Sequence, residues 1–166
     1  MTERNGDREM DWNNIEYFEQ SEFDDPLYPG SGENIDSLLV FEMDSLRRAT
    51  GWPIIIHKLL TTLPNGKIFS IGGAVDMYGE HGHSDGSYHL FENGCMACDW
   101  HFVTDAPYRL QYRAVEKMGF TGIGVYLGIW HWAGKLLPVA FHTDRRLKEK
   151  IQRWSCREKG KYFYLL

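Results

Sequence analysis

The sequence has no run of about 18 apolar residues, the length that a membrane-spanning helix needs. Its start, MTERNGDREMDWNN, is acidic and polar, whereas a signal peptide requires a basic segment followed by an apolar one. The three cysteines cannot all pair within one chain, so we expect no disulfide framework. We therefore expect a protein with no membrane span that is made in the cytosol without a signal peptide.

An excess of positive charge is also lacking. The formal net charge at pH 7 is −5, which does not favour a surface that binds phosphates, and we expect no nucleic acid partner. The basic residues between 145 and 161 are most simply explained as a solvated face. Aromatic residues, in contrast, make up 14% of the chain, which is enough to line a cleft as well as to fill a core.

The chain of 166 residues is long enough for one domain with one continuous core. Residues 1–13 carry charged and amide side chains and have almost nothing to bury, so they are predicted to form a flexible acidic tail. A single domain is predicted for residues 14–166.

Hydrophobic spacing predicts two helices. The first covers residues 36–50 and ends at Gly51. The second covers residues 106–118, with Thr104 or Asp105 as its cap and a glycine directly after it.

Strand composition recurs along the chain. A β-branched run that starts at Pro53 has the composition of a central strand, and residues 97–103 alternate as a strand does. The Gly-rich residues 66–86 keep no period and are predicted to form a long loop. Later β-branched and aromatic segments, which indicate an antiparallel sheet, lie at 122–132, 136–144 and 161–166. The order of elements predicts an α+β domain with a small antiparallel sheet flanked by helices.

Residue types that bind metals are concentrated in GSYHLFENGCMACDWHF, residues 86–102. A catalytic zinc site needs three ligands from His, Asp, Glu or Cys and leaves the fourth position to water. Candidates across the chain are His81, His83, His89, Cys95, Cys98, Asp99, His101, His131 and His142. His89 closes the Gly-rich loop, Asp99 lies in the next predicted strand, and His142 lies in a much later one. These three fit a facial triad.

Cys95 and Cys98 offer a rival structural zinc site, which His89 and His101 could complete. No second Cys-x-x-Cys pair exists, and the role of a small buried hydrophobic residue explains each cysteine better. Taken singly, each histidine is also better explained as a core or surface residue.

A set of motifs appears in a fixed order: Tyr17-Phe18, Ser21-Glu22-Phe23, MDSLRRATGWPIII, Gly72-Gly73-Ala74, GIGVY at 122–126, FHTDRR at 141–146 and the terminal RW and GKYFYLL. A pattern Ser-x-His, Gly, Ala-x-Asp is present as Ser87, His89, Gly94, Ala97 and Asp99. No single piece is specific, but the ordered set resembles the M15 family of zinc peptidases, which includes D-alanyl-D-alanine carboxypeptidases and phage endolysins. The resemblance runs through nearly the whole chain.

The resemblance implies the hedgehog/DD-peptidase fold, with zinc bound by His89, Asp99 and His142. It implies a peptidoglycan stem peptide as the substrate. Asp144 would hold His142 in orientation. Zinc would lower the pKa of its water to roughly 7 and polarise the scissile carbonyl, as amide hydrolysis at neutral pH requires.

Three departures from the family pattern affect the chemistry. The spacing between His89 and Asp99 is longer by three residues, which a loop or bulge must absorb. The family's Ser-Gly-Tyr-Arg is replaced by HKLL, so Lys58 or a distant arginine must contact the oxyanion or the substrate carboxylate. An acid that some members carry as general base, three residues before the last ligand, is replaced by Val139.

Another residue must therefore act as the base. His131 is the preferred candidate because its strand is predicted to neighbour that of His142, although packing against aromatic side chains is the competing explanation. Glu92, Asp85 and His101 are the alternatives. Candidate substrate contacts are Ser87, Lys58 and Trp132.

The first interpretation is a zinc-dependent peptidase that hydrolyses an amide bond in peptidoglycan stem peptides, either as a D-Ala-D-Ala carboxypeptidase or as an endolysin-like endopeptidase. We expect such an enzyme to be encoded by a phage and to act at the cell wall. The second is a catalytically impaired chain of the same fold that serves as a binding or structural component of a phage or similar assembly. The departures favour the second interpretation, and the intact His, Asp, His set favours the first. A third is a small zinc-stabilised module built on Cys95 and Cys98.

Overall fold

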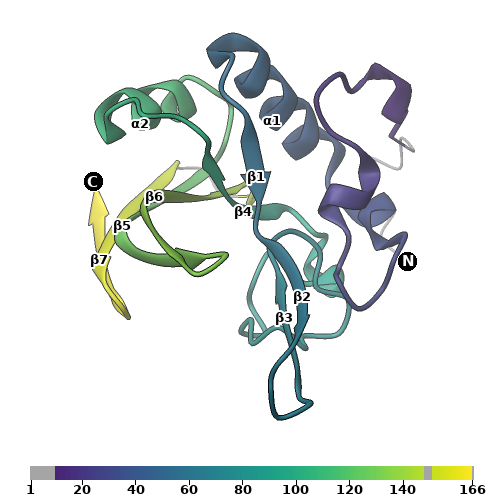
Figure 1. Cartoon of the computed structure of the whole chain (residues 1–166). Coiled ribbons are helices and arrows are strands. Elements are labelled where there is room, and N and C mark those ends of the chain that lie inside the picture. Colours follow the sequence, from purple (N-terminus) through teal and green to yellow (C-terminus); the bar gives the residue numbers. More distant parts are fainter. Residues whose placement is uncertain (1–9, 148–150, 166) are drawn as a thin grey trace.

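Two helices and eight strands form an α+β fold in the computed structural model, which describes residues 10–147 and 151–165 (Figure 1). The helices are α1 (Ser37–Thr50) and α2 (Tyr108–Glu116). The strands are β1 (Ile54–Ile56), β2 (Lys58–Thr62), β3 (Ile68–Gly72), β4 (Ala97–Phe102), β5 (Gly122–Trp132), β6 (Lys135–Asp144), β7 (Gln152–Glu158) and β8 (Lys161–Leu165). Four short 3-10 helices are η1 (Trp12–Asn14), η2 (Gln20–Phe23), η3 (Ser31–Asn34) and η4 (Phe91–Asn93).

Six strands form one sheet in the order β1-β4-β6-β5-β7-β8, and β2 and β3 form a separate hairpin. Neighbouring strands of the large sheet are antiparallel except β5 and β7, which are parallel. The prediction of an antiparallel sheet is therefore corrected to a mixed one. The reason is that β6 ends at Asp144 beside Gly122, and β7 begins at Gln152 beside the same Gly122, so β7 repeats the direction of β5.

Both helices lie on one side of the large sheet, and the β2–β3 hairpin projects on the other side (Figure 1). In α1 the apolar residues Leu39, Met43 and Leu46 are fully buried, together with Trp100 and Phe141 of the sheet. Burial of this apolar face stabilises the domain more than helix propensity does. The core thus lies between the helices and the sheet, which leaves the opposite face of the sheet for polar groups.

The first helix agrees with its prediction over residues 36–50. The Asp36 carboxylate accepts a hydrogen bond from the Leu39 amide, and Gly51 ends the helix in the left-handed conformation. The second helix is shorter than predicted, because it begins directly after Pro107 and ends at Glu116, before Gly119. Thr104 and Asp105 do not cap it.

Three strand predictions are corrected. The run after Pro53 forms an edge strand, because β1 pairs only with β4 and the chain leaves the sheet after Ile56. The predicted loop 66–86 contains β3, whose hairpin with β2 is exposed and has no buried face to impose an alternating pattern. The basic segment expected to be a solvated face contains β7, which buries Trp154 and Cys156.

Of the predicted tail, residues 1–9 lie outside the described residues. Residues 10–13 are described, and there Met10 and Trp12 pack against the core cluster, while η1 begins at Trp12. Among the described residues, no helix has the length and apolar character required to cross a membrane.

Candidate metal centre

The three predicted ligands come from two neighbouring strands and a loop. Asp99 in β4 and His142 in β6 are direct cross-strand partners, so their side chains point to the same face of the sheet. His89 lies near the end of the long connection between β3 and β4. The structure brings together three residues that are 10 and 43 positions apart in the sequence, and we call His89, Asp99 and His142 the sheet cluster.

The donor atoms of the sheet cluster face one another. His89 Nε2 lies 3.3 Å from His142 Nδ1 and 3.5 Å from Asp99 Oδ2. His142 Nδ1 lies 2.8 Å from Asp99 Oδ1. The side chains of His89, Asp99 and His142 are 3%, 12% and 13% exposed, so the site is buried but open on one side. The two imidazole nitrogens thus converge on the Asp99 carboxylate, where they face different oxygens.

Hydrogen bonds on the far side of each ring select the nitrogen that can bind an ion. His89 Nδ1 lies 3.1 Å from the Ala74 carbonyl, to which it can only donate. His142 Nε2 lies 3.0 Å from the Asp144 carboxylate, which accepts its hydrogen. In the neutral rings that a bound ion would require, the lone pairs are on Nε2 of His89 and Nδ1 of His142, the two atoms that face Asp99. Without an ion, His142 Nδ1 carries a hydrogen and donates it to Asp99 Oδ1.

Gly73 and Ala74 explain the Gly-Gly-Ala motif noted in the sequence. The Gly73 carbonyl accepts a hydrogen bond from the Asp99 amide at 2.6 Å, while the Ala74 carbonyl orients His89. A Cβ on Gly73 would collide with the backbone of His57. Glycine is required at position 73 because the backbone there lies against β4 and against His57, which directly follows β1.

The longer spacing between His89 and Asp99 is absorbed by a compact turn. The turn is η4 (Phe91–Asn93), which Gly94 ends with a φ of 93° in the left-handed region. The Cys95 amide then donates to the Leu90 carbonyl at 3.2 Å. The departure from the family spacing therefore does not prevent the ligands from converging.

Two side chains hold the Asp144 carboxylate in place. Its carboxylate accepts from His142 and from Arg146, whose Nε lies 2.7 Å from Oδ1. The Arg146 guanidinium lies over the rings of Tyr88 and Trp154, at 5.0 and 5.1 Å from their centroids. Arg146 is thus an arginine close to the site, but it is committed to orienting Asp144.

The charges of the cluster are strongly coupled. Burial lowers the pKa of His89 to about 4, which keeps this imidazole neutral. Burial also acts to lower the pKa of His142, but hydrogen bonds to Asp144 and Asp99 outweigh it and raise the value to about 9. Burial acts to raise the pKa of Asp99, yet His89 and His142 hold it well below its usual range. Without a metal ion, a proton on His142 therefore balances the negative charge.

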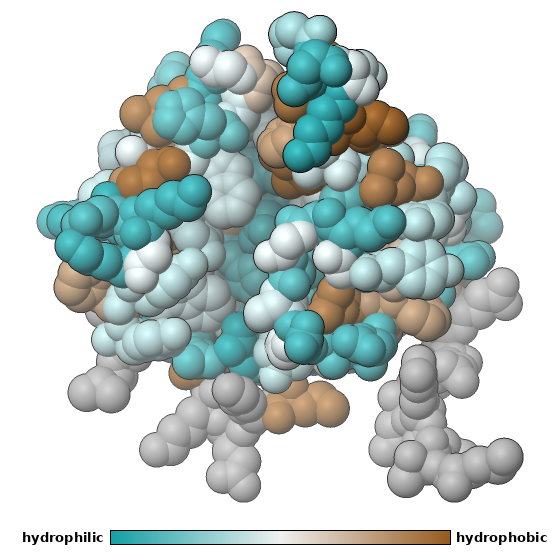
Figure 2. Space-filling view, turned by 90° about the horizontal axis from the view of Figure 1, so that it is seen from below, coloured by the Kyte–Doolittle hydropathy of each residue, from teal (hydrophilic) through white to brown (hydrophobic). Residues whose placement is uncertain are grey.

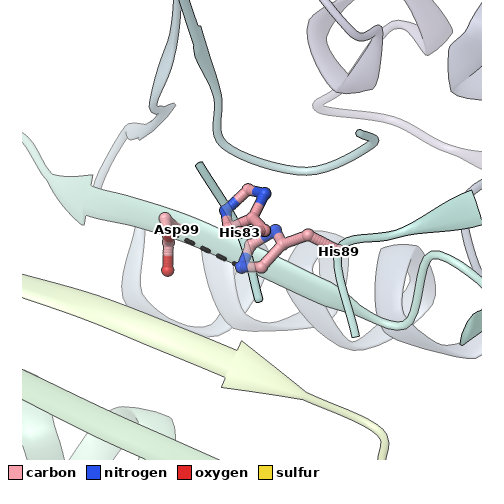
Figure 3. Close-up of side chains that lie close together, drawn as sticks. All are labelled: His83, His89 and Asp99. Carbon is pink, nitrogen blue, oxygen red and sulfur yellow. Dashed lines mark ion pairs between the residues drawn. The ribbon is translucent and has the colours of Figure 1, made fainter. Parts of the chain in front are cut away.

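A fourth residue lies against the cluster. His83, His89 and Asp99 also place one potential ligand atom each within 4.8 Å of one another (Figure 3). The rings of His83 and His89 are stacked at 4.3 Å with an angle of only 2° between their planes. An imidazole lone pair lies in its ring plane, and parallel planes do not meet, so these two rings as placed cannot bind one ion. The planes of His89 and His142 are 68° apart and do intersect.

A cleft of about 460 Å³ opens beside Asp99 of the sheet cluster. It is lined by His81, His83, Asp99 and His131, by Phe69, Ile71, Gly72, Ile129 and Trp130, and by Lys159. Figure 2 views the side of the molecule opposite the helices and shows a hollow with a hydrophilic floor. The cleft thus has apolar walls on β3 and β5 and a polar floor.

The predicted catalytic residues lie at different places. His131 is exposed on β5 and lines the cleft. Asp144 is fully buried behind His142. Glu92 is exposed in η4 and Asp85 is exposed in the preceding loop, and neither lines the cleft. Val139, at the position of the expected acid, is buried.

The predicted substrate contacts make contacts within the protein. The Ser87 hydroxyl accepts from the His89 amide at 3.3 Å. The Lys58 ammonium donates to the Ser21 carbonyl and does not line the cleft. Trp132 stacks on His57, with ring centroids 4.8 Å apart. Lys159, which the sequence did not single out, is the cation at the cleft wall.

His57 and His101 form a buried pair beside the cluster. His57 Nε2 lies 2.9 Å from His101 Nδ1, and His101 does not line the cleft. His57 Nδ1 has no hydrogen-bond partner among the described residues, and burial lowers the pKa of His57 to about 3. Both imidazoles are therefore neutral packing residues next to Trp132.

A second group of ligand types, which we call the loop cluster, consists of Asp25, Asp76 and His81. His81 Nε2 lies 2.9 Å from Asp25 Oδ1. The Asp25 carboxylate also accepts from the amides of Leu27 and Met77, at 2.8 and 2.9 Å. The Asp76 carboxylate accepts from two further amides and from His83. These carboxylates are satisfied by the protein itself and tie the N-terminal segment to the long loop.

The cysteines take no part in either group. Cys95, Cys98 and Cys156 are free and buried. Burial raises the pKa of Cys95 to about 12 and that of Cys98 well above its usual value. Among the described residues, neither group of three potential ligands contains a cysteine. The role of small buried residues is confirmed, and the Cys95 and Cys98 zinc module has no support.

Sequence reasoning missed the roles of two residues. Asp76 had no signal other than being an acid in a Gly-rich loop. His83 was considered only as one ligand among nine, because nothing in GEHGHSDG shows that it pairs with Asp76 and stacks on His89.

Comparisons with protein family models, with curated proteins and with solved structures each returned no match to this chain.

Proposed function

We propose that this protein is a zinc-dependent peptidase that hydrolyses an amide bond in a peptidoglycan stem peptide. The observation that carries the proposal is the convergence of His89 and His142 on Asp99, which lines a cleft. It agrees with the set that the resemblance to M15 peptidases implied.

The spacing of the donor atoms suits zinc. Ligands about 2.0 to 2.1 Å from a tetrahedral ion are about 3.3 Å from one another. The two imidazole nitrogens are 3.3 Å apart, and they lie 2.8 and 3.5 Å from different oxygens of Asp99. Two imidazoles and one carboxylate form a catalytic rather than a structural donor set, because three ligands leave the fourth position open.

The chemistry that zinc supplies when bound is a lower pKa for a water molecule and polarisation of the scissile carbonyl. The protein's own residues do the rest. Ala74 and Asp144 hold the ligand rings, Arg146 holds Asp144, and the walls of the cleft bind the peptide. Lys159 is placed to contact a carboxylate of the substrate, a role for which Lys58 had been predicted.

A second candidate function is a binding component of a phage or similar assembly that keeps the zinc but does not hydrolyse peptides. Val139, which stands where some family members carry an acid, favours it, as does the engagement of Arg146 with Asp144.

The experiment is zinc analysis together with an assay of stem-peptide hydrolysis, on wild type, His89→Ala and His142→Ala. We expect about one zinc per chain and hydrolysis in wild type, and the loss of both in either variant. His131→Ala is the matched control for metal content, because this histidine is exposed and lies outside the sheet cluster. Zinc that survives both ligand changes would overturn the proposed site, and zinc without hydrolysis would favour the binding component.

A further inference from the structure

Asp76 holds His83 in one tautomer. His83 Nδ1 lies 2.8 Å from Asp76 Oδ2, and the Asp76 side chain is completely buried. The other oxygen of Asp76 accepts from the amides of Gly79 and Glu80, at 2.7 and 3.1 Å, which fixes the carboxylate in place. An ionised carboxylate only accepts hydrogen bonds, so the hydrogen is on Nδ1 and the lone pair of His83 is on Nε2.

His83 stands at the edge of the metal centre without belonging to it. Its ring is parallel to that of His89, so it cannot share an ion with this ligand. It nevertheless lines the cleft together with Asp99, and its side chain is 20% exposed. Among the described residues, no hydrogen bond to His83 Nε2 is formed. His83, whose neutral ring carries its lone pair on Nε2, therefore borders the space that a substrate would enter.

The other candidate bases lack this combination. His131 lines the cleft but has no side chain that orients it among the described residues. Glu92 and His101 do not line the cleft. A base that is fixed by a buried carboxylate needs little reorganisation when the substrate binds.

We infer that His83 is the catalytic base of the hydrolysis, in place of the acid that is missing at Val139, and that Asp76 is its positioning residue. The inference rests on the proposed function. The oxygen of the attacking water forms a bond to the carbonyl carbon, and the O–H bond breaks as the proton passes to His83 Nε2. The proton is then given to the amide nitrogen as the C–N bond breaks, so water and amide become a carboxylic acid and an amine. The Asp76 carboxylate stabilises the imidazolium between the two steps.

The test compares His83→Phe, His83→Ala and Asp76→Asn with wild type in zinc content and in the kcat and KM for a stem peptide. His83→Phe is the sharpest variant, because it keeps a flat ring against His89 and removes only the nitrogens. We expect kcat to fall about 10²- to 10⁴-fold in both His83 variants, with KM and zinc content unchanged. Asp76→Asn should lower kcat by about tenfold or more, because a neutral amide does not stabilise the imidazolium and its NH2 group can donate to Nδ1, which moves the ring hydrogen to Nε2.

Added imidazole distinguishes proton transfer from a structural role. It should restore part of the kcat of His83→Ala, where it fits the space that the ring leaves, and should not restore that of His83→Phe. Hydrolysis by His83→Phe within about threefold of wild type would overturn the inference while leaving the proposed function intact. Loss of zinc in His83→Phe would overturn it as well, because His83 would then support the metal. A wild-type protein that binds zinc and hydrolyses no stem peptide would overturn both proposals.

Discussion

The sheet cluster and the loop cluster contain the same residue types but satisfy them differently. In the loop cluster, the carboxylates of Asp25 and Asp76 accept hydrogen bonds from four backbone amides as well as from histidines. In the sheet cluster, the Asp99 carboxylate has only the two facing imidazoles as partners among the described residues. A carboxylate whose oxygens accept hydrogen bonds from backbone amides holds a loop together. A carboxylate that contacts only imidazole rings remains available to an ion that those rings can also bind.

The largest effect that separates the two clusters is expected from Asp25→Ala. The change leaves the amides of Leu27 and Met77 and the His81 ring without their acceptor, and it should lower the free energy of unfolding by about 3 kcal/mol. Zinc content should stay as in wild type, because Asp25 does not belong to the sheet cluster. Urea unfolding measures the stability, and metal analysis measures the zinc content. The control is Asp105→Ala, which replaces an exposed aspartate and should change the free energy of unfolding by less than about 0.5 kcal/mol. If Asp25→Ala kept the stability of wild type but lost its zinc, the loop cluster would be the metal site and the prediction would be wrong.

Zinc should stabilise the folded protein only by binding to the sheet cluster. At a free zinc concentration about 100 times the dissociation constant, the free energy of unfolding of wild type should rise by about 2.7 kcal/mol. His142→Ala removes a ligand and should abolish this gain, while His81→Ala should keep it although it weakens the loop cluster. Thermal unfolding with and without zinc measures the gain. An equal gain in His142→Ala would show that the ion binds elsewhere.

His57 shows what a buried imidazole does without a carboxylate on its ring. Burial lowers the pKa of His57 to about 3, so on acidification the unfolded chain takes up a proton near the ordinary value of 6.5 and the folded chain does not. The stability that His57 contributes is therefore present above about pH 6.5 and is lost as the pH falls, by about 2 kcal/mol at pH 5. His57→Phe keeps the stack on Trp132 and should remove this part of the acid sensitivity. Urea unfolding of metal-free wild type and variant at about pH 7.5 and 5 tests it, and an equal loss in both proteins would contradict it.

The smallest effect is expected behind the sheet cluster, at Asp144→Asn. The Asn side chain retains the size of Asp144 but weakens the hydrogen bond that orients His142 and the contact with Arg146. Zinc affinity should fall by about tenfold, or ~1.4 kcal/mol, while the metal remains bound at saturation. Competition with a chromophoric chelator measures the affinity. Unchanged affinity would mean that Asp144 only supports the fold.

Local chemistry in the sequence was sufficient for some elements. The helix over residues 36–50 could be predicted because its apolar spacing, its aspartate cap and its terminal glycine all agree. The hairpin of β2 and β3 could not, because an exposed pair of strands carries no alternation of buried and exposed positions. The strand β7 was hidden by basic residues at its exposed positions, although Trp154 and Cys156 at alternate positions are buried.

The residues of the candidate site also fall into some that the sequence predicts and some that it does not. His89, Asp99 and His142 were predictable as a set because strand neighbours and a loop end suggested them and an ordered family pattern agreed. The role of His83 was not predictable, because both its partners depend on how the long loop folds back over the sheet.

The sequence by itself determined the α+β composition, the first helix, the identity of the metal-ligand candidates and the absence of a cysteine framework, because these follow from local spacing and residue type. Only the tertiary structure decided which histidines could share an ion. That choice depends on the angle between ring planes and on the hydrogen bond behind each ring, and both are set by contacts between segments far apart in the chain.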